Sequence, residues 1–550
     1  MTNDRYFTVN QQYLANYTKT FVQVHNLNVM LGYEQYKYKY QYHYGYNDHL
    51  YSPNFGELGN AFGNDQKSLS SYTDNYMTEG ILSRVQYDYD NKYFVSASYR
   101  RDASSVFAPG HRWGNFGSVG LAWQMNKENF LQDQSWIDLL KVKASFGVQG
   151  NDGILLGGAR SFYAYANRYA PSYNSTTGEY AVTMVQMGNE DLTWESSHSW
   201  NVGVDFSFFG YRLNGTIDYY NRKTTDMLYY KTLPLSSGIS VDSYPANVGS
   251  MRNSGIEVTL DGTIIKTRDW EWGLNLNFTH NKNKILELDP SIAEDGLKYS
   301  NSILREGGTI YQAYMVKYAG TNKETGKATY YMDVQVPVTD ASGNVMKDEE
   351  GNAITRTERT TTEDLTKATK YDCGTTLPKL YGGFGTTLSA YGFDLSAQFT
   401  YQLGGKIYDG VYQSLMHNGL SAGSNMHKDL LKAWSPENPT SDIPRLSTAS
   451  TDDPGVGSQT PMDRFLTNSN YLALNNLTLG YTVPKSVVNR IKIGSIRVFV
   501  SGENLFLLTA RKGLDPRFNY GLGSMTSGSG MSSGSYSAMR TVTGGLTLTF

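Results

Sequence analysis

The chain ends with Arg540-Thr-Val-Thr-Gly-Gly-Leu-Thr-Leu-Thr-Phe550, in which apolar and polar residues alternate. Val542, Leu546, Leu548 and Phe550 share one parity, and threonine and glycine occupy the other. Because successive side chains of a strand point to opposite faces, this stretch predicts a β-strand with one apolar face and one polar face. The strand closes on an aromatic ring.

The same alternation recurs along the chain. We count about fifteen such segments. They begin near residues 8, 25, 80, 92, 114, 140, 196, 212, 252, 270, 379, 393, 470, 495 and 540. In one of them Val202, Val204, Phe206 and Phe208 alternate with Asn, Gly, Asp and Ser. The polar parity holds mainly Asn, Asp, Gln, Ser, Thr and Gly, which suits a water-filled lumen better than the packed core of a β-sandwich.

The connections between these segments alternate in length. Tight turns are expected at Asp90-Asn91, at Gly210, at 266–269 and at Gly392. Long polar stretches, the expected external loops, occupy 43–79, 150–195, 227–251, 287–378, 408–469 and 509–539. Short turns on one side and long loops on the other are typical of an outer-membrane barrel. The sequence therefore predicts an all-β fold, a transmembrane antiparallel β-barrel in the cell outer membrane, with Phe550 as the signal to the barrel assembly machinery.

Composition excludes several other classes of protein. Tyrosine supplies 44 of the 550 residues, and no run approaches the ~18 apolar residues of a membrane helix. A net charge of −3 gives no basic footprint for nucleic acid. The predicted barrel makes membrane lipid the expected surrounding. The single Cys373 can form no intrachain disulfide.

The strand count raises the question of completeness. An intact bacterial barrel has an even number of strands and both termini inside. Fifteen strands counted back from an inward-running last strand place Met1 on the external side, and the N-terminus shows no apolar signal core. We therefore expect residues 1–550 to be the C-terminal portion of a longer barrel protein.

Several motifs then suggest a family. They lie at 100–105 with 112–114, 189–195, 218–226, 247–257, 501–506 and 513–516. In order and spacing they resemble motifs of the SusC/RagA family, the TonB-dependent outer-membrane importers of Bacteroidetes. Glu190 stands where that family has proline, and Ala103 stands where glycine is common.

The resemblance implies more than the strands do. It implies a 22-stranded barrel preceded by a plug, of which this chain would supply about 15 strands and no plug. It also implies partners, namely a SusD-like surface lipoprotein and the TonB complex, the latter acting through an N-terminal region that this chain lacks. The implied ligand is a glycan or a peptide.

No group of residues has the spacing of a catalytic site. The eight histidines are scattered, and His43 with His49 is their only near pair. The glycine-rich stretch 521–534 has no Gly-Lys-Ser/Thr for phosphate. We therefore expect neither an enzyme nor a metal or cofactor site.

The sharpest local feature is a run of six tyrosines at alternate positions from Tyr36 to Tyr46. Leu27, Val29, Leu31 and Tyr33 of the same strand should face lipid, so the tyrosines should face the lumen or its external vestibule. Flat rings with hydroxyl groups suit sugars, which makes Tyr38, Tyr40, Tyr42 and Tyr44 the candidate substrate-binding residues. The alternative is cross-strand packing, for which tyrosine is also favoured.

Three functions are compatible with these patterns. The leading hypothesis is the barrel part of a TonB-dependent importer of glycans or oligopeptides. The alternatives are a passive outer-membrane porin and a non-functional fragment of the importer. A soluble β-rich adhesin is disfavoured by the terminal aromatic strand.

Overall fold

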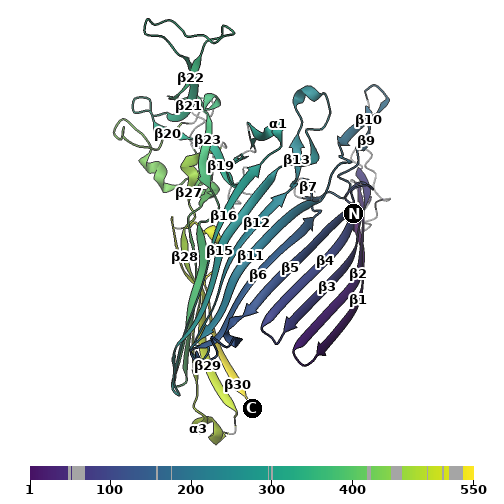
Figure 1. Ribbon diagram of the computed structural model, residues 1–550. Helices are drawn as coiled ribbons and strands as arrows, with labels where there is room; N and C mark the ends of the chain where they lie inside the picture. The colour runs from purple at the N-terminus through teal and green to yellow at the C-terminus, as the bar shows by residue number, and fades with distance from the viewer. Residues whose placement is uncertain are drawn as a thin grey trace. The chain divides into compact units, whose positions relative to one another are not determined.

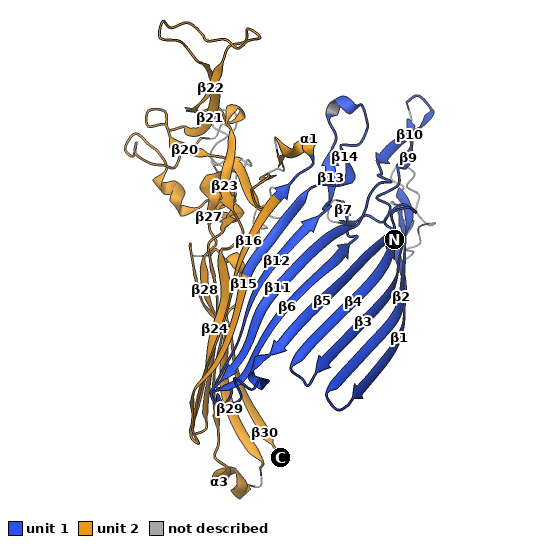
Figure 2. Ribbon diagram, in the orientation of Figure 1, with its two compact units in different colours: residues 1–255, 286–289 blue, residues 256–285, 290–550 orange. Residues whose placement is uncertain are grey.

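The computed structural model describes the chain except residues 48–50, 52–57, 59–67, 157–158, 175, 295, 299–300, 418–422, 448–460, 492, 511–512 and 519–536. Parts of the expected loops 43–79, 150–195, 287–378, 408–469 and 509–539 thus lie outside the described residues, as does His49. The chain divides into two compact units, drawn in different colours in Figure 2. Unit 1 is 1–255 with 286–289, and unit 2 is 256–285 with 290–550.

Fifteen antiparallel strands form one large sheet in the order β1-β2-β3-β4-β5-β6-β11-β12-β15-β16-β24-β25-β28-β29-β30 (Figure 1). Strands of the sheet in unit 1 are β1 (Thr2–Phe21), β2 (His25–Tyr46), β3 (Ser68–Tyr89), β4 (Tyr93–Ser104), β5 (Trp113–Gln124), β6 (Ile137–Asn151), β11 (Glu195–Phe208) and β12 (Leu213–Thr225). The division between the units falls within β15 (Ser250–Lys266). Unit 2 contributes β16 (Trp270–Glu287) except its last two residues, which belong to unit 1. It also contributes β24 (Leu380–Ala390), β25 (Phe393–Leu403), β28 (Tyr471–Thr482), β29 (Ser495–Thr509) and β30 (Thr541–Thr549). The predicted all-β class and the strand count are confirmed.

Shorter elements lie in the connections. In unit 1 these are β7 (Leu155–Leu156), β8 (Ala159–Arg160), β9 (Arg168–Asn174), β10 (Glu179–Gln186), β13 (Leu228–Thr232) and β14 (Ser243–Asn247). In unit 2 they are β17 (Leu297–Lys298), β18 (Ser302–Leu304), β19 (Gln312–Val316), β20 (Tyr318–Thr321), β21 (Ala328–Pro337), β22 (Thr355–Thr362), β23 (Lys370–Thr375), β26 (Lys406–Tyr408) and β27 (Leu466–Asn468). The helices are α1 (Pro290–Ala293), α2 (Gly410–Leu415) and α3 (Lys485–Val488), with several single 3₁₀ turns. Among the described residues no helix has the length and apolar character needed to cross a membrane.

Tight hairpin turns join neighbouring strands of the sheet. Asp90 and Asn91, between β3 and β4, both have positive φ, at 53° and 50°. Val22 and Gln23, between β1 and β2, also have positive φ, at 51° and 63°. Two successive left-handed residues make the turn whose twist matches that of the flanking strands. These connections are therefore short, whereas those at the other strand ends carry the loops.

The register of unit 1 separates an apolar face from a polar face. Val202 of β11 is the partner of Ala144 in β6, and Val204 is the partner of Val142 in β6 and of Ile217 in β12. The apolar parity is well exposed, with Leu31 at 59%, Val119 at 50% and Val202 at 46% of their surface. Exposed aliphatic side chains in long, regular strands suit a face that meets lipid.

Aromatic side chains edge this apolar face at both ends. At the turn end Tyr93 stacks on Trp123 at 6.5 Å, and Trp136 packs on Phe208 at 5.2 Å. Toward the loops Tyr13 stacks on Tyr33 at 6.4 Å, and Trp200 packs on Tyr219 at 5.2 Å. Two such rows are the girdles that barrels place at membrane interfaces.

In unit 2 the loop segments fold into a packed cap. Four of its core residues are nearly inaccessible, namely Met315, Tyr330, Met416 and Met462. The rest of the core is Ala313, Val316, Ala328, Cys373, Tyr408, Leu430 and Phe465. Cys373 lies in the same core, and burial raises the pKa of its thiol. The sequence analysis treated these stretches as long polar loops and did not predict a core.

One arm projects from this cap, as Figure 1 shows for β21 and β22. At its tip Val338, Met346 and Ile354 close a ring of backbone hydrogen bonds, in which each N–H donates to the next carbonyl at 2.8 Å. The five-residue pattern Asp-x-x-Gly-Asn occurs twice in this tip, eight residues apart, at 340–344 and 348–352. In both, the aspartate accepts from the backbone amide of the asparagine. The tip is thus held by its own turns.

Candidate ligand-facing site

The tyrosine run lies in β2 and continues onto both neighbouring strands. Tyr38 is the register partner of Thr8 in β1 and Tyr76 in β3, and Tyr40 is the partner of Tyr6 and Asp74. β2 extends to Tyr46, so all six tyrosines belong to one regular strand. Their parity is opposite to that of the exposed Leu31 and Tyr33, and they therefore line the polar face of unit 1.

The four candidate residues already have aromatic neighbours. Tyr40 stacks on Tyr6 at 4.7 Å, and its hydroxyl donates to Asp4 Oδ1 at 2.7 Å. The centre of the Tyr42 ring lies 5.1 Å from that of Tyr72 and 6.5 Å from that of Tyr44. These ring contacts are what a packed ladder requires, while the rings remain only partly buried. The geometry accommodates both hypotheses for the ladder, and its ligand role stays a prediction.

Tyr38 faces a loop residue that the sequence analysis did not single out. Its ring lies 5.9 Å from Phe162, which also lies 5.7 Å from Tyr76. Phe162 follows β8, in the connection between β6 and β11. The loop thereby covers one end of the ladder.

A buried carboxylate holds that loop in place. Asp152, only 9% exposed, accepts from the Tyr76 hydroxyl at 2.8 Å and from Ser104 Oγ at 2.6 Å. Arg160 pairs with the other carboxylate oxygen and lies over the Tyr76 ring at 4.4 Å. The partners are 48, 76 and 8 residues away in sequence, so no local spacing could have predicted this group. Beside it lies a small core of Val106, Phe107, Ile154, Ala164 and Leu192.

Charged side chains continue along the polar face of unit 1. Arg100 binds Asp102 at 2.7 Å and Glu34 at 3.0 Å. Nearer the turns Lys143 lies between Asp205 at 2.8 Å and Asp218 at 3.1 Å. The aromatic ladder and these paired charges make a surface able to offer hydrogen bonds and flat apolar contacts to a polar ligand.

The family-like motifs serve structural roles. Thr193 donates its backbone N–H to Asn247 Oδ1 at 2.9 Å, and Asn247 Nδ2 donates back to the Thr193 carbonyl at 3.0 Å. The motif at 189–195 is thereby joined to the motif at 247–257. In unit 2, Arg517 bridges Asp515 and Asn504, which joins the motif at 513–516 to that at 501–506. A cavity of about 520 Å³ lies beside this bridge.

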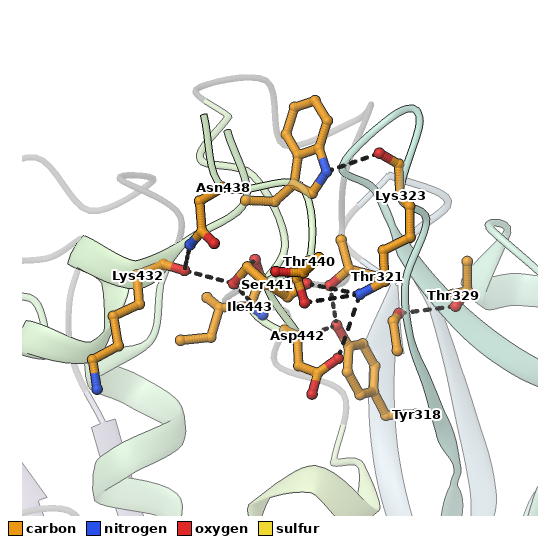
Figure 3. Close-up of polar contacts among 12 residues, drawn as sticks. Tyr318, Thr321, Lys323, Thr329, Lys432, Asn438, Thr440, Ser441, Asp442 and Ile443 are labelled. Atoms are coloured by element: carbon orange, nitrogen blue, oxygen red, sulfur yellow. Dashed lines mark hydrogen bonds and ion pairs between the residues drawn. The ribbon is translucent and has the colours of Figure 1, made fainter. Parts of the chain in front are cut away.

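A second polar group fixes the cap of unit 2 (Figure 3). Lys323 Nζ donates to the Thr440 carbonyl at 3.0 Å and to that of Ser441 at 3.4 Å, and it lies 3.7 Å from Asp442. The Tyr318 hydroxyl donates to the Asp442 carbonyl at 2.8 Å. Every group in this set has a partner within the chain, which indicates a strap between two loops rather than a ligand site. Across the described part of the chain no cluster of three or more metal-binding side chains occurs.

Comparison with known proteins identifies the family. The model of the family described as TonB dependent receptor-like, beta-barrel, matches residues 1–505. The chain belongs to this family. Its members are outer-membrane β-barrels of a transport system rather than enzymes, so the cell outer membrane is the location of this chain, as the sequence predicted.

Named relatives come from Bacteroidetes. TonB-dependent receptor P3 of Formosa agariphila is 30% identical over 99% of this chain and 52% of its own length. TonB-dependent receptor SusC of Bacteroides thetaiotaomicron is 27% identical over 83% of this chain and 43% of its own length. The resemblance to SusC/RagA is thus confirmed, and the chain spans about half the length of these relatives.

Solved structures agree with the fold. The structure of the RagAB peptide transporter is 28% identical and has a TM-score of 0.76, over 94% of this chain and 53% of the solved chain. The RagAB peptide importer in its open-open state is 26% identical with a TM-score of 0.76, over 100% of this chain and 55% of the solved chain.

Proposed function

We propose that this chain is the barrel portion of a TonB-dependent importer of glycans or oligopeptides and has no enzymatic activity. The observation that supports it most directly is the polar face of unit 1, where the tyrosine ladder of β2 lies beneath the loop held by Asp152. Aromatic rings with hydroxyl groups, flanked by paired charges, can bind a polar polymer through several weak contacts. Relatives that share the fold include a structure described as a peptide transporter.

We also propose the partners that this function requires. A SusD-like surface lipoprotein would act at the loop end, and the TonB complex would supply energy through a region outside this chain. Uptake by such a system stops when the proton gradient of the inner membrane is dissipated. A passive porin would continue to conduct under the same treatment, which separates the two functions.

The test replaces the ladder in the outer-membrane protein that carries this chain. Changing Tyr38, Tyr40, Tyr42 and Tyr44 to alanine should weaken capture of substrate while leaving barrel assembly intact. If the energy of an aromatic pair carries over, each ring contributes ~0.5–1.5 kcal/mol beyond its area burial, so four should be visible in binding. The measurement is the affinity for fluorescent oligopeptides and for labelled oligosaccharides, which also distinguishes the two substrate classes.

Two comparisons make the result interpretable. The fourfold tyrosine-to-phenylalanine variant keeps the rings and removes the hydroxyls, so it separates stacking from hydrogen bonding. Heat-modifiable gel mobility reports whether each variant assembles. Unchanged affinity together with reduced assembly would show that the ladder is structural.

A further inference from the structure

Three cations lie together on the apolar face of unit 1, at the loop end of the first two strands. Arg5 belongs to β1, and Lys37 and Lys39 belong to β2. Lys39 is the register partner of Phe7, and Lys37 is the partner of Val9. Arg5 is two residues from Phe7, so its side chain is on the same face and diagonal to Lys39.

These three side chains are exposed and form no ion pair among the residues that the structure describes. On the polar face of the same unit, in contrast, Arg100 and Lys143 each lie between two carboxylates. By strand register, the neighbouring carboxylate on the apolar face is Glu79, which is diagonal to Lys37 and accepts from the Tyr33 hydroxyl at 3.4 Å. A patch with a local excess of positive charge therefore faces outward.

Its height relative to the membrane follows from the aromatic row. Tyr13 and Tyr33 mark the upper edge of the apolar band, and Lys37 is four residues beyond Tyr33 on the same strand. Four residues of strand span ~13 Å, less along the membrane normal because barrel strands tilt. Lys39 is six residues beyond Tyr33, and Arg5 pairs with Gln41, which is eight residues beyond it. The three cations thus extend from the level of the lipid headgroups outward, with Phe7 of β1 opposite Lys39 and the partly buried Met77 of β3 opposite Lys37.

We propose that Arg5, Lys37 and Lys39 form a binding site for the phosphate groups of an outer-leaflet glycolipid. Ammonium and guanidinium groups bind phosphate by charge-assisted hydrogen bonds, and a basic cluster beside a membrane attracts anionic headgroups. One polar row, formed by Gln11, Gln35 and Glu79, separates the patch from the Tyr13–Tyr33 row of the lipid-facing band. A lipid can therefore place its headgroup across this row while its acyl chains stay on the band below. This assignment is independent of what the importer transports.

The experiment uses the outer-membrane protein that carries this chain, delipidated in a neutral detergent. It is titrated with diphosphoryl lipid A and with the same lipid after removal of its phosphates. The variant changes Arg5, Lys37 and Lys39 to glutamine. Each charge contributes about fivefold, so the triple variant should bind the phosphorylated lipid roughly a hundredfold more weakly. Affinity for the dephosphorylated lipid should not change. Added salt should reduce the difference between the affinities of the unchanged protein and the triple variant for the phosphorylated lipid.

A matched control removes three cations elsewhere, as Lys19→Gln, Arg84→Gln and Lys141→Gln. Lys19 is on β1 at the opposite end of the apolar face, and Arg84 and Lys141 are on the polar face. This control should keep full affinity, and so should Arg5→Lys with Lys37→Arg and Lys39→Arg. Millimolar inorganic phosphate that displaces the lipid would show a site for phosphate in general, whereas failure to compete would show that the acyl chains are required. Equal binding of both lipids, or equal loss in the control, would overturn the proposal.

Discussion

At the scale of single residues, Asp152 shows how distant positions create the candidate site. Its carboxylate accepts hydrogen bonds from β3 and from the end of β4, and it pairs with Arg160 of β8. Alternation in the sequence places Tyr76 on the polar face. It gives no information about which loop covers Tyr76. Tyr36 to Tyr46 could therefore be predicted as one surface, whereas Phe162 and Asp152 could not.

Asp152→Asn should loosen the loop between β6 and β11. The substitution keeps the shape but removes the charge that three donors share, and a hydrogen bond to a charged group is worth about 1.5–3 kcal/mol. Hydrogen exchange of the amides in 152–166 should accelerate accordingly, while exchange in β5 and β6 stays unchanged. Asp191→Asn is the matched control, because that side chain is 96% exposed in the same connection. Equal exchange in both variants would contradict the anchoring role.

At the scale of the elements, the sheet strands were the part best predicted from sequence. Starting points near 92, 114, 140 and 196 lie within three residues of β4, β5, β6 and β11. β3 begins at Ser68, well before the expected position near 80, because Ser, Thr and Tyr continue the ladder without an aliphatic parity. The cap of unit 2 was missed for a related reason. Its core is assembled from short segments with no repeating period, so periodicity gives no signal.

Spin labels test the two faces of the strands. Labels at Val204 in β11 and Leu276 in β16 should be reached by oxygen and shielded from a water-soluble nickel complex, because both positions share the apolar parity. Labels at Ser145 and Asn277 should show the reverse, since their parity is polar. Burial of the Val204 and Leu276 labels in a dry core, shielded from both reagents, would exclude a lipid-facing band.

At the scale of the whole molecule, the two edge strands of the large sheet determine whether the chain can insert stably into a membrane. β1 and β30 each have a single hydrogen-bonded neighbour among the described residues. An unpaired strand edge is unfavourable in lipid, where backbone groups find no water. Membership of the family could be predicted from sequence because the family's motifs are short and local. In the structure these motifs hold strand ends together, as the hydrogen bond between Thr193 and Asn247 does.

We predict that residues 1–550 expressed alone, with an export signal added, aggregate or are degraded. Both edges would then remain without partners during insertion. The measurement is the fraction in the outer membrane, with heat-modifiable mobility as the sign of a closed barrel. A heat-modifiable, ion-conducting product from this chain alone would instead favour the passive porin.

The ring at the tip of the β21–β22 arm has a practical consequence. Pro337 and Thr355 are register partners, so everything from Val338 to Ile354 leaves and re-enters the hairpin at one point. A peptide epitope or a fluorescent tag can replace this segment while the strand pairing below it remains. The arm is therefore a suitable site for a tag that reports the position of the protein on the surface of a living cell.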